Sequence, residues 1–181
     1  MKTKAGVIWD KLPQRFKRYM RPATLDDVNY MEKHASEMSR KEATYMHHKS
    51  VQEACFHGLA RYCKHLCVTL VNREGRIFGM GGVSPESVWL LLCEGATEDP
   101  DIRRLLTREA RPFLRWVMNE SGLVTAEALE NQTFDGEGID VLLRWLRWLG
   151  ADVMRVPMYH RDYHVFWFPR SRFATNQQGS D

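Results

Sequence analysis

Hydrophobic residues occur along this chain in two patterns, one with the spacing of amphipathic helices and one as the compact runs of buried strands. The strongest run, residues 88–93, reads VWLLLC and predicts a buried strand. A polar turn follows at 94–98, and then a helix for which Asp99 is a suitable N-cap and Pro100 a suitable first residue. Unpaired N–H groups at such a helix start commonly bind anions, so this turn is the first place to look for function.

The same two patterns predict the other helices and strands. Apolar residues recur with helical spacing at residues 25–39, 50–64, 99–121 and 139–149. Short apolar runs bounded by turn residues predict strands at residues 19–23, 66–71, 76–83, 88–93, 123–129, 151–157 and 163–168. We interpret this order as an α/β (α+β) fold, a single domain in which a mixed central sheet is flanked by helices.

Three features modify this picture. The stretches 40–48 and 131–138 are polar and are predicted to be a linker and a loop. Pro112 lacks an N–H group, so it should bend or split the long helix. The three glycines within residues 79–82 weaken their strand, and they predict either a bulge or the close approach of another backbone segment.

Charge is spread unevenly along the 181 residues. The first 22 residues carry a net charge of +6, whereas the whole chain carries +3. We therefore divide the chain into a basic arm at 1–18, a domain at 19–169 and a disordered tail at 170–181. Apolar residues such as Phe16 predict that the arm docks in part on the domain; the alternative is a solvated, partly ordered N-terminus.

Composition excludes several classes of protein. No apolar run approaches the roughly 20 residues of a membrane-spanning helix. Four cysteines without a signal peptide indicate a reducing, cytoplasmic setting. Cys55, Cys63 and Cys67, together with His57 and His65, match no metal-ligand spacing, so we predict that they are core or surface residues and form no metal site.

Four segments, taken in order, resemble the GNAT acetyltransferases. The opening MRPATLDDV at 20–28 resembles the family's first strand and helix start, and the hairpin around Gly75 lies where its second and third strands fall. Asn131 follows the fifth predicted strand, as an Asn often does in the family, and LRWLGA at 146–151 is similar to the end of the next helix. The similarity spans about residues 19–168. It implies the GNAT fold and, in active members, transfer of an acetyl group from acetyl-CoA to an amine.

Within that family the chain looks like GNAT-like proteins of short-tailed phages, some of which are internal virion proteins. The points of similarity are RPAT at 21–24, the tryptophan-rich strand at Trp89, the arginine-rich long helix, and WLGAD at 148–152. This narrower resemblance implies the host cytoplasm or the virion as the location, and virion components as protein partners.

The resemblance also implies where acetyl-CoA would bind. The corresponding positions are Cys93, Gly95, Ala96, Arg103, Arg104 and Asn131. Active members have a glycine-rich turn here whose N–H groups hold the pyrophosphate, but this chain keeps Gly95 alone of those glycines. Pro100 removes one N–H donor. Glu98, Asp99 and Asp101 place carboxylates where two phosphates would lie.

These features favour a protein without normal acetyltransferase activity and without a bound cofactor, which acts through protein contacts in virion assembly or genome delivery. Leu146 stands where the family often has its general-acid tyrosine, so no catalytic residue is assigned. The alternative is a true acetyl-CoA-dependent N-acetyltransferase in which Arg103 and Arg104 replace the glycine-rich turn. A third hypothesis is nucleic-acid binding through the basic arm and the arginine-rich helix face. The arginines of that face are Arg103, Arg104, Arg108, Arg111 and Arg115.

Overall fold

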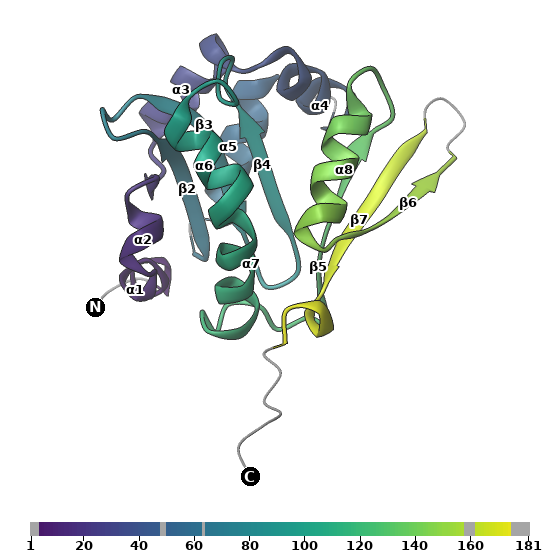
Figure 1. Ribbon diagram of the computed structural model, residues 1–181. Coiled ribbons are helices and arrows are strands. Elements are labelled where there is room, and N and C mark those ends of the chain that lie inside the picture. The colour runs from purple at the N-terminus through teal and green to yellow at the C-terminus, as the bar shows by residue number, and fades with distance from the viewer. Residues whose placement is uncertain (1–3, 48–49, 63, 158–161, 175–181) are drawn as a thin grey trace.

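The computed structural model of the protein describes residues 4–47, 50–62, 64–157 and 162–174. The helical segments are α1 (Lys4–Lys11), α2 (Gln14–Lys17), α3 (Leu25–His34), α4 (Glu37–His47), α5 (Val51–Tyr62), α6 (Pro100–Arg104), a π-helical segment (Leu105–Glu109), α7 (Ala110–Asn119), α8 (Ile139–Leu149) and a 3₁₀ turn (Arg170–Arg172). The strands are β1 (Met20–Pro22), β2 (Leu66–Val71), β3 (Ile77–Val83), β4 (Val88–Leu92), β5 (Ala128–Phe134), β6 (Asp152–Val156) and β7 (Tyr163–Pro169). Together they form a single α+β domain (Figure 1).

Two antiparallel sheets form the centre of the molecule (Figure 1). The strand order is β1-β2-β3-β4 in the first sheet and β5-β7-β6 in the second. β4 and β5 are joined by a parallel bridge between Ser87 and Glu130, where the Glu130 N–H donates to the Glu86 carbonyl at 2.8 Å. Away from this bridge the two strands diverge, so the sheets form the two sides of a wedge.

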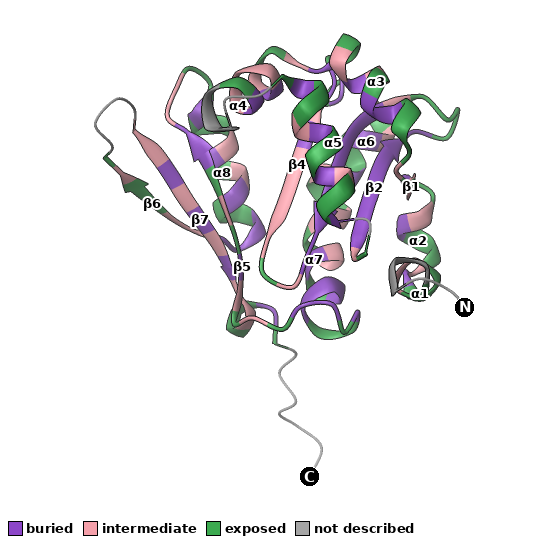
Figure 2. Cartoon of the chain, turned by 180° about the vertical axis from the view of Figure 1, so that it is seen from behind, coloured by how far each residue is buried: buried purple, intermediate pink, exposed green. Residues whose placement is uncertain are grey.

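The helices cover both faces of this wedge. α6, α7 and α8 lie on one face, and α3 and α5 lie on the other (Figures 1 and 2). The buried residues of β2 and β3 face both layers, because every residue of β2 is buried and β3 is buried from its second residue onward. Since both of their faces are covered, β2 and β3 are continuous buried runs. β4, which was predicted to be a buried strand, is fully buried only at Leu91 and is otherwise partly exposed.

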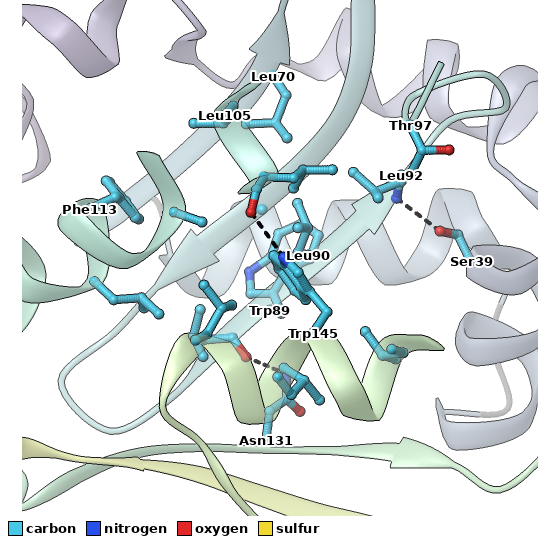
Figure 3. Close-up of a pocket in the computed structure, with 18 of the residues that line it drawn as sticks. Ser39, Leu70, Trp89, Leu90, Leu92, Thr97, Leu105, Phe113, Asn131 and Trp145 are labelled. Atoms are coloured by element: carbon cyan, nitrogen blue, oxygen red, sulfur yellow. Dashed lines mark hydrogen bonds between the residues drawn. The ribbon is translucent and has the colours of Figure 1, made fainter. Parts of the chain in front are cut away.

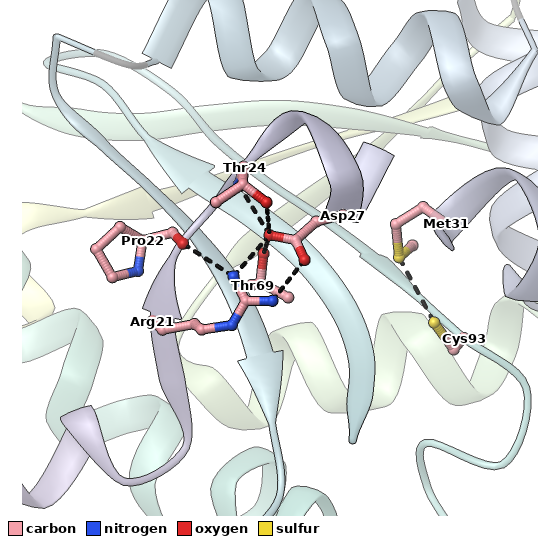
Figure 4. A network of polar contacts seen from close by, with 7 residues as sticks. All are labelled: Arg21, Pro22, Thr24, Asp27, Met31, Thr69 and Cys93. Carbon is pink, nitrogen blue, oxygen red and sulfur yellow. Dashed lines mark hydrogen bonds and ion pairs between the residues drawn. The ribbon is translucent and has the colours of Figure 1, made fainter. Parts of the chain in front are cut away.

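Asp27 is a buried carboxylate that joins β1, α3 and β2 (Figure 4). Its oxygens accept two hydrogen bonds from the Arg21 guanidinium, at 2.8 and 2.6 Å, and one from the Thr69 hydroxyl at 2.7 Å. The Thr24 N–H donates to the same carboxylate at 2.8 Å, as part of a capping box at the start of α3. Burial alone would raise the pKa of Asp27, but these hydrogen bonds outweigh it and hold the pKa below its usual value.

The glycines of β3 allow β4 to approach closely, as predicted. A Cβ at Gly79 would lie 2.6 Å from the Leu91 carbonyl oxygen, and one at Gly82 would lie 2.5 Å from Nε1 of Trp89. Both distances are shorter than a van der Waals contact. These positions therefore admit no side chain unless β4 moves.

The long helix is interrupted near Pro112, as predicted. Its middle turn is π-helical at Leu105–Glu109, where the Ala110 N–H bonds to the Leu105 carbonyl. Pro112 has no N–H to donate, and its ring excludes the carbonyl four residues earlier, so the regular ladder cannot continue through this turn.

The prediction of one helix at 25–39 followed by a linker at 40–48 is wrong. The first helix ends at His34, and a second helix, α4, runs through most of the predicted linker. The break occurs because Ala35 pairs with Cys93 and the Ser36 N–H bonds to the Leu92 carbonyl at 2.8 Å. Ser36 then begins α4, since its Oγ accepts a hydrogen bond from the Ser39 N–H. Residue 48 lies outside the described residues.

The fifth strand is also displaced from its predicted position. Residues 123–127 are not in a strand, and β5 begins at Ala128 and continues through Phe134. Asn131 is therefore inside β5 and not in a loop after it. The apolar pair Leu123 and Val124 misled the prediction, because both side chains are buried although their backbone is irregular.

Both ends of the described chain pack on the domain. Leu12 and Phe16 are buried in the core, which confirms the predicted docking of the arm's apolar residues. The prediction of a disordered tail from residue 170 is wrong for its first residues. Arg170 donates to the carbonyls of Met118 and Val124, each at 2.9 Å, and Phe173 is buried. Residues 175–181 of the predicted tail lie outside the described residues.

Candidate functional site

A large apolar cavity lies in the opening between β4 and β5 (Figure 3). Its volume is about 530 Å³, which is within the range of small-molecule binding sites. β4, the π-helical segment and α7 form one side of the cavity, and α8 and β7 form the other. The larger apolar side chains of the wall include Leu90, Leu92, Leu105, Leu106, Phe113, Trp145, Leu146, Leu149 and Phe168.

The polar side chains of this wall are largely bonded to the protein itself (Figure 3). Four of them each bond to a main-chain group of another segment or turn. These pairs are Ser39 with the Leu92 N–H (2.8 Å), Trp145 with the Leu106 carbonyl (2.9 Å), Thr107 with the Arg103 carbonyl (2.7 Å) and Asn131 with the Val88 carbonyl. The cavity therefore presents mostly hydrocarbon to a ligand.

A smaller and more polar cavity, of about 300 Å³, adjoins the first. Its wall includes His57 and Arg61 of α5, and the Tyr62 hydroxyl, which lies 2.6 Å from Ser87 Oγ. Four residues line both cavities, and we call them the junction. They are Glu42, Trp89, Leu90 and Asn131.

Glu42 is the ionisable residue of the junction. It belongs to α4, and burial raises its pKa to about 7. A carboxyl group with this pKa can take up and release a proton near neutral pH, which is what a general base must do. Sequence analysis missed Glu42 because its stretch was predicted to be a linker. A glutamate there gives no sign of burial until α4 is placed against β4.

The edge of β4 offers a free main-chain donor at the junction. The Leu92 N–H and the Val88 carbonyl both point away from β3, to Ser39 and Asn131 respectively. Because such groups alternate along an antiparallel strand, the Leu90 N–H points into the same opening. It has no hydrogen-bond partner among the residues that the structure describes. Leu90 therefore presents an unused N–H at the junction, which Glu42 also lines.

The turn between β4 and α6 uses its own N–H groups. The N–H groups of Glu98 and Asp99 both donate to the Gly95 carbonyl at 3.1 Å. The Asp99 carboxylate caps α6 as predicted, accepting from the N–H groups of Asp101 at 3.0 Å and Ile102 at 3.1 Å. Four N–H groups of the turn and helix start that could hold a pyrophosphate are thus already bonded within the protein.

The β2–β3 hairpin fixes the two carboxylates of this turn in place. Asn72 Nδ2 donates to Asp99 at 3.0 Å, and the Arg73 N–H donates to Asp101 at 3.1 Å. The Arg73 guanidinium also pairs with Asp101 at 3.1 Å. Two carboxylates held at the helix start repel a phosphate, and the N–H that Pro100 lacks is not replaced. The turn does not fit the pyrophosphate of a CoA thioester in the usual way.

The structure separates the six residues that the sequence predicted to bind a cofactor. Two of them, Arg103 and Asn131, line the large cavity. The other four lie outside its wall, in the turn, in the core or on the surface: Cys93, Gly95, Ala96 and Arg104. Cys93 faces Met31 at 3.5 Å between the sulfur atoms (Figure 4), and burial raises its pKa to about 11. It is therefore a neutral thiol at physiological pH.

Two further observations concern the described part of the chain. No three of its His, Cys, Asp and Glu side chains gather in a way that could hold a metal ion. Cys55 and Cys67 are buried, whereas Cys63 lies outside the described residues. None of the described helices has both the length and the apolar character needed to cross a bilayer.

Comparison with known proteins identifies the fold. No protein-family model and no curated protein sequence matches the chain. Its structure is similar to that of an acetyltransferase from Agrobacterium tumefaciens str. C58, with a TM-score of 0.56 and 15% identity over 82% of this chain and 88% of that one. It is also similar to a mutant spermidine N-acetyltransferase from Vibrio cholerae, with a TM-score of 0.52 and 7% identity over 88% and 97%. The chain therefore has the GNAT fold, as its order of elements predicted.

Proposed function

We propose that the protein transfers an acyl group from a thioester to an amine at the junction between the two cavities. The observation that carries this proposal is Glu42, a carboxyl group with a pKa of about 7 that lines both cavities. The free N–H of Leu90 lies at the same place and suits the carbonyl oxygen of a thioester. The similarity in fold to N-acetyltransferases supports this class of reaction, although a fold alone does not determine a function.

The reaction needs one proton acceptor and one donor for the developing oxyanion. The Glu42 carboxylate takes a proton from the amine as the nitrogen lone pair attacks the thioester carbonyl carbon. The Leu90 N–H stabilises the negative charge on the carbonyl oxygen. When the carbon–sulfur bond breaks, its electron pair stays on sulfur, and the thiolate accepts the proton that Glu42 received. The products are an amide and a thiol, and Glu42 is again ionised.

The two cavities suit the two substrates of this reaction. The apolar cavity accepts the thioester, and the smaller cavity, with His57, Arg61 and Tyr62 in its wall, accepts the polar amine. Arg103 is exposed and lines the large cavity near the turn, where it can contact an anionic group of the donor. The alternative that the sequence left open assigned this role to Arg103 and Arg104 together, but only Arg103 lines the cavity.

Glu42→Gln tests the proposal, because glutamine keeps the shape of the side chain and cannot accept the proton. We expect the rate of thiol release from an acyl thioester in the presence of amines to fall by about 100-fold or more. In the unmodified protein, kcat/KM should rise as the pH approaches about 7 and then level off, since the base must be ionised. Glu37→Gln, an exposed glutamate of the same helix, is the matched control. Equal activity of Glu42→Gln and the control would remove Glu42 from the mechanism.

A second candidate is a non-catalytic protein that acts through protein contacts. The closed turn favours it, because the Asp99 carboxylate occupies the N–H groups that a pyrophosphate would need. The resemblance to phage proteins stays a prediction, and it proposes virion components as partners in the host cytoplasm or the virion. Calorimetric titration with acetyl-CoA separates the candidates. Binding at about 10 μM or tighter contradicts the non-catalytic hypothesis, and the absence of heat and of transfer with all thioesters supports it.

Nucleic-acid binding is a third proposal, and the placement of the arm favours it. The Phe16 ring of α2 lies 5.5 Å from the Phe113 ring of α7, and Arg15 and Arg18 approach Glu109 at 4.0 and 3.9 Å. The basic arm and the arginine-rich helix are therefore neighbours. Binding to a DNA duplex that weakens steeply with added salt would support this proposal, and salt-independent or absent binding would contradict it.

A further inference from the structure

We infer that the large cavity takes a long hydrocarbon chain, so that the acyl donor is a medium- or long-chain thioester rather than an acetyl thioester. This inference rests on the proposed function and names the class of its donor substrate. Three observations carry it: the extent of the cavity beyond the junction, the chemistry of its wall, and the unused N–H of Leu90 at the junction.

The cavity extends along β4 on both sides of the junction. α6 begins at the turn and α7 leads away from it, and α8 runs in the same direction on the opposite wall (Figure 1). Thr97 and Arg103 therefore line the end of the cavity near the turn, and Leu149 and Phe168, near the ends of α8 and β7, line the other end. Leu90 is in the middle of β4, between these ends. An acyl group whose carbonyl is at Leu90 has the far end available for its tail.

The volume exceeds what an acetyl group needs. The cavity measures about 530 Å³. A methylene group is about as large as a water molecule, whose share of liquid volume is about 30 Å³, so the space accommodates a chain on the order of ten carbons. Protein interiors are close-packed, and an acetyl group would leave the part of this space beyond Leu90 empty.

The wall favours hydrocarbon over polar ligands. The polar groups of four wall residues are bonded to the protein's own backbone, as described above: Ser39, Thr107, Asn131 and Trp145. A phosphate placed among the apolar side chains would lose its water without gaining partners. Each methylene group buried here instead increases affinity by a factor of about two to four. Burial of the hydrocarbon chain thus supplies binding free energy in place of the pyrophosphate contacts that the closed turn does not make.

The junction holds the carbonyl end of the chain. The Leu90 N–H is unused at this place and suits the carbonyl oxygen of the acyl group. The Trp89 indole is fixed closely against α5 and β3, because a Cβ at Gly58 would lie 2.5 Å from its ring and one at Gly82 would lie 2.5 Å from Nε1. The acyl group then passes from sulfur to the amine nitrogen in the step given above, whatever its length.

Chain-length dependence tests the inference in the unmodified protein. Acetyl-, hexanoyl-, decanoyl- and tetradecanoyl-CoA are titrated by calorimetry, and free decanoate is titrated in parallel. We expect affinity to rise by a factor of about two to four per methylene up to about the decanoyl chain. Acetyl-CoA that binds as tightly as decanoyl-CoA would overturn the inference. If free decanoate binds, the cavity recognises the hydrocarbon chain itself, which supports the inference. If decanoyl-CoA binds tightly and free decanoate does not bind, the protein recognises the thioester group rather than the chain alone.

The same series separates the inference from the proposed function. If affinity rises with chain length but no donor gives an amide, the hydrocarbon site stands and acyl transfer fails. If acetyl-CoA and decanoyl-CoA give amide at equal rates, acyl transfer stands and the hydrocarbon site fails.

Ala110→Phe provides a second test, because this alanine of α7 lines the cavity and a phenyl ring there fills part of it. We expect decanoyl-CoA affinity to fall by about tenfold or more while acetyl-CoA affinity stays the same. Ala60→Phe, at an exposed position of α5 outside both cavity walls, is the matched control. Equal loss of both ligands would contradict the inference. Should Ala110→Phe fail to fold, the series in the unmodified protein still decides the question.

Discussion

Two carboxyl groups show how the environment of single residues sets what this protein can bind. Asp99 accepts hydrogen bonds from two N–H groups and from Asn72, so its carboxylate is held at the start of α6, where it excludes other anions. Glu42 is partly buried among the elements around it, and this burial raises its pKa to about 7. The same chemical group excludes anions at the start of α6 and supplies a candidate proton acceptor at the junction.

Asp99→Ser tests the first role. Serine is also a good N-cap, so the free energy of unfolding should change by no more than about 1 kcal/mol. The lost negative charge should increase the affinity for CoA several-fold, because like charges near this turn no longer repel the phosphates. Calorimetric titration with CoA measures the change. Glu120→Ser, just beyond the C-terminal end of α7, serves as control, and unchanged affinity in Asp99→Ser would show that repulsion at the turn is unimportant.

Asp27→Asn tests the buried network of β1, α3 and β2. The amide cannot accept all the hydrogen bonds of the carboxylate, so the free energy of unfolding should fall by about 2–3 kcal/mol at neutral pH. Because the folded state lowers the pKa of Asp27, its contribution is complete above the unfolded pKa of about 4 and is lost as the pH falls through the lower folded value. Denaturant unfolding at pH 7 and pH 3 should therefore show a smaller difference between the two proteins at pH 3.

The exposed neighbour Asp26 provides the control for that experiment. Asp26→Asn should leave the unfolding free energy within about 0.5 kcal/mol of the unmodified protein at both pH values. If the two substitutions have equal effects, the network does not stabilise the fold as the structure indicates.

At the scale of helices and strands, the elements with local signals were predicted well. β2, β3 and β4 are apolar runs bounded by turn residues, and the start of α6 has its own cap and proline. These features depend on residues that are adjacent in the chain. Their positions follow from the sequence because no distant segment is needed to define them.

The elements that were predicted wrongly depend on distant contacts. α3 ends at His34 because Ala35 pairs with Cys93, nearly sixty residues away. Leu123 and Val124 are buried without forming a strand, so the fifth strand was predicted too early in the chain. The second half of the true β5, which follows the exposed Glu130, was therefore predicted to be a loop. The same errors concealed the candidate site, since Glu42 lies on α4 and Asn131 lies within β5.

Phe173→Ala tests the docking of the segment that follows β7. The ring is buried against Gly150, where a Cβ would lie 3.3 Å from its tip. Removing it should lower the free energy of unfolding by about 3–5 kcal/mol, through lost burial and a remaining cavity. Chemical denaturation measures this, with Ser171→Ala at an exposed position as control. A loss below about 1 kcal/mol would show that the segment is only loosely attached.

At the scale of the whole molecule, the incomplete union of the two sheets creates the candidate site. β4 and β5 are joined near Ser87 and Glu130 and diverge elsewhere. Each strand therefore keeps main-chain N–H and carbonyl groups that would be hydrogen-bonded to the other strand in a continuous sheet. α7 and α8 line the resulting wedge with apolar side chains. A ligand in the wedge contacts both sheets at once, and its binding therefore stabilises their relative placement.

The order of the strands has a further consequence for the protein during its synthesis. β7 is the middle strand of the second sheet, yet it follows both of its neighbours in the chain. A nascent chain thus carries β5 and β6 with exposed edges until the ribosome has added Pro169 at the end of β7. Exposed edges pair readily with other chains. Neighbouring nascent copies on one messenger RNA are the nearest competitors for those edges, and a chaperone that covers β5 and β6 would act in this interval.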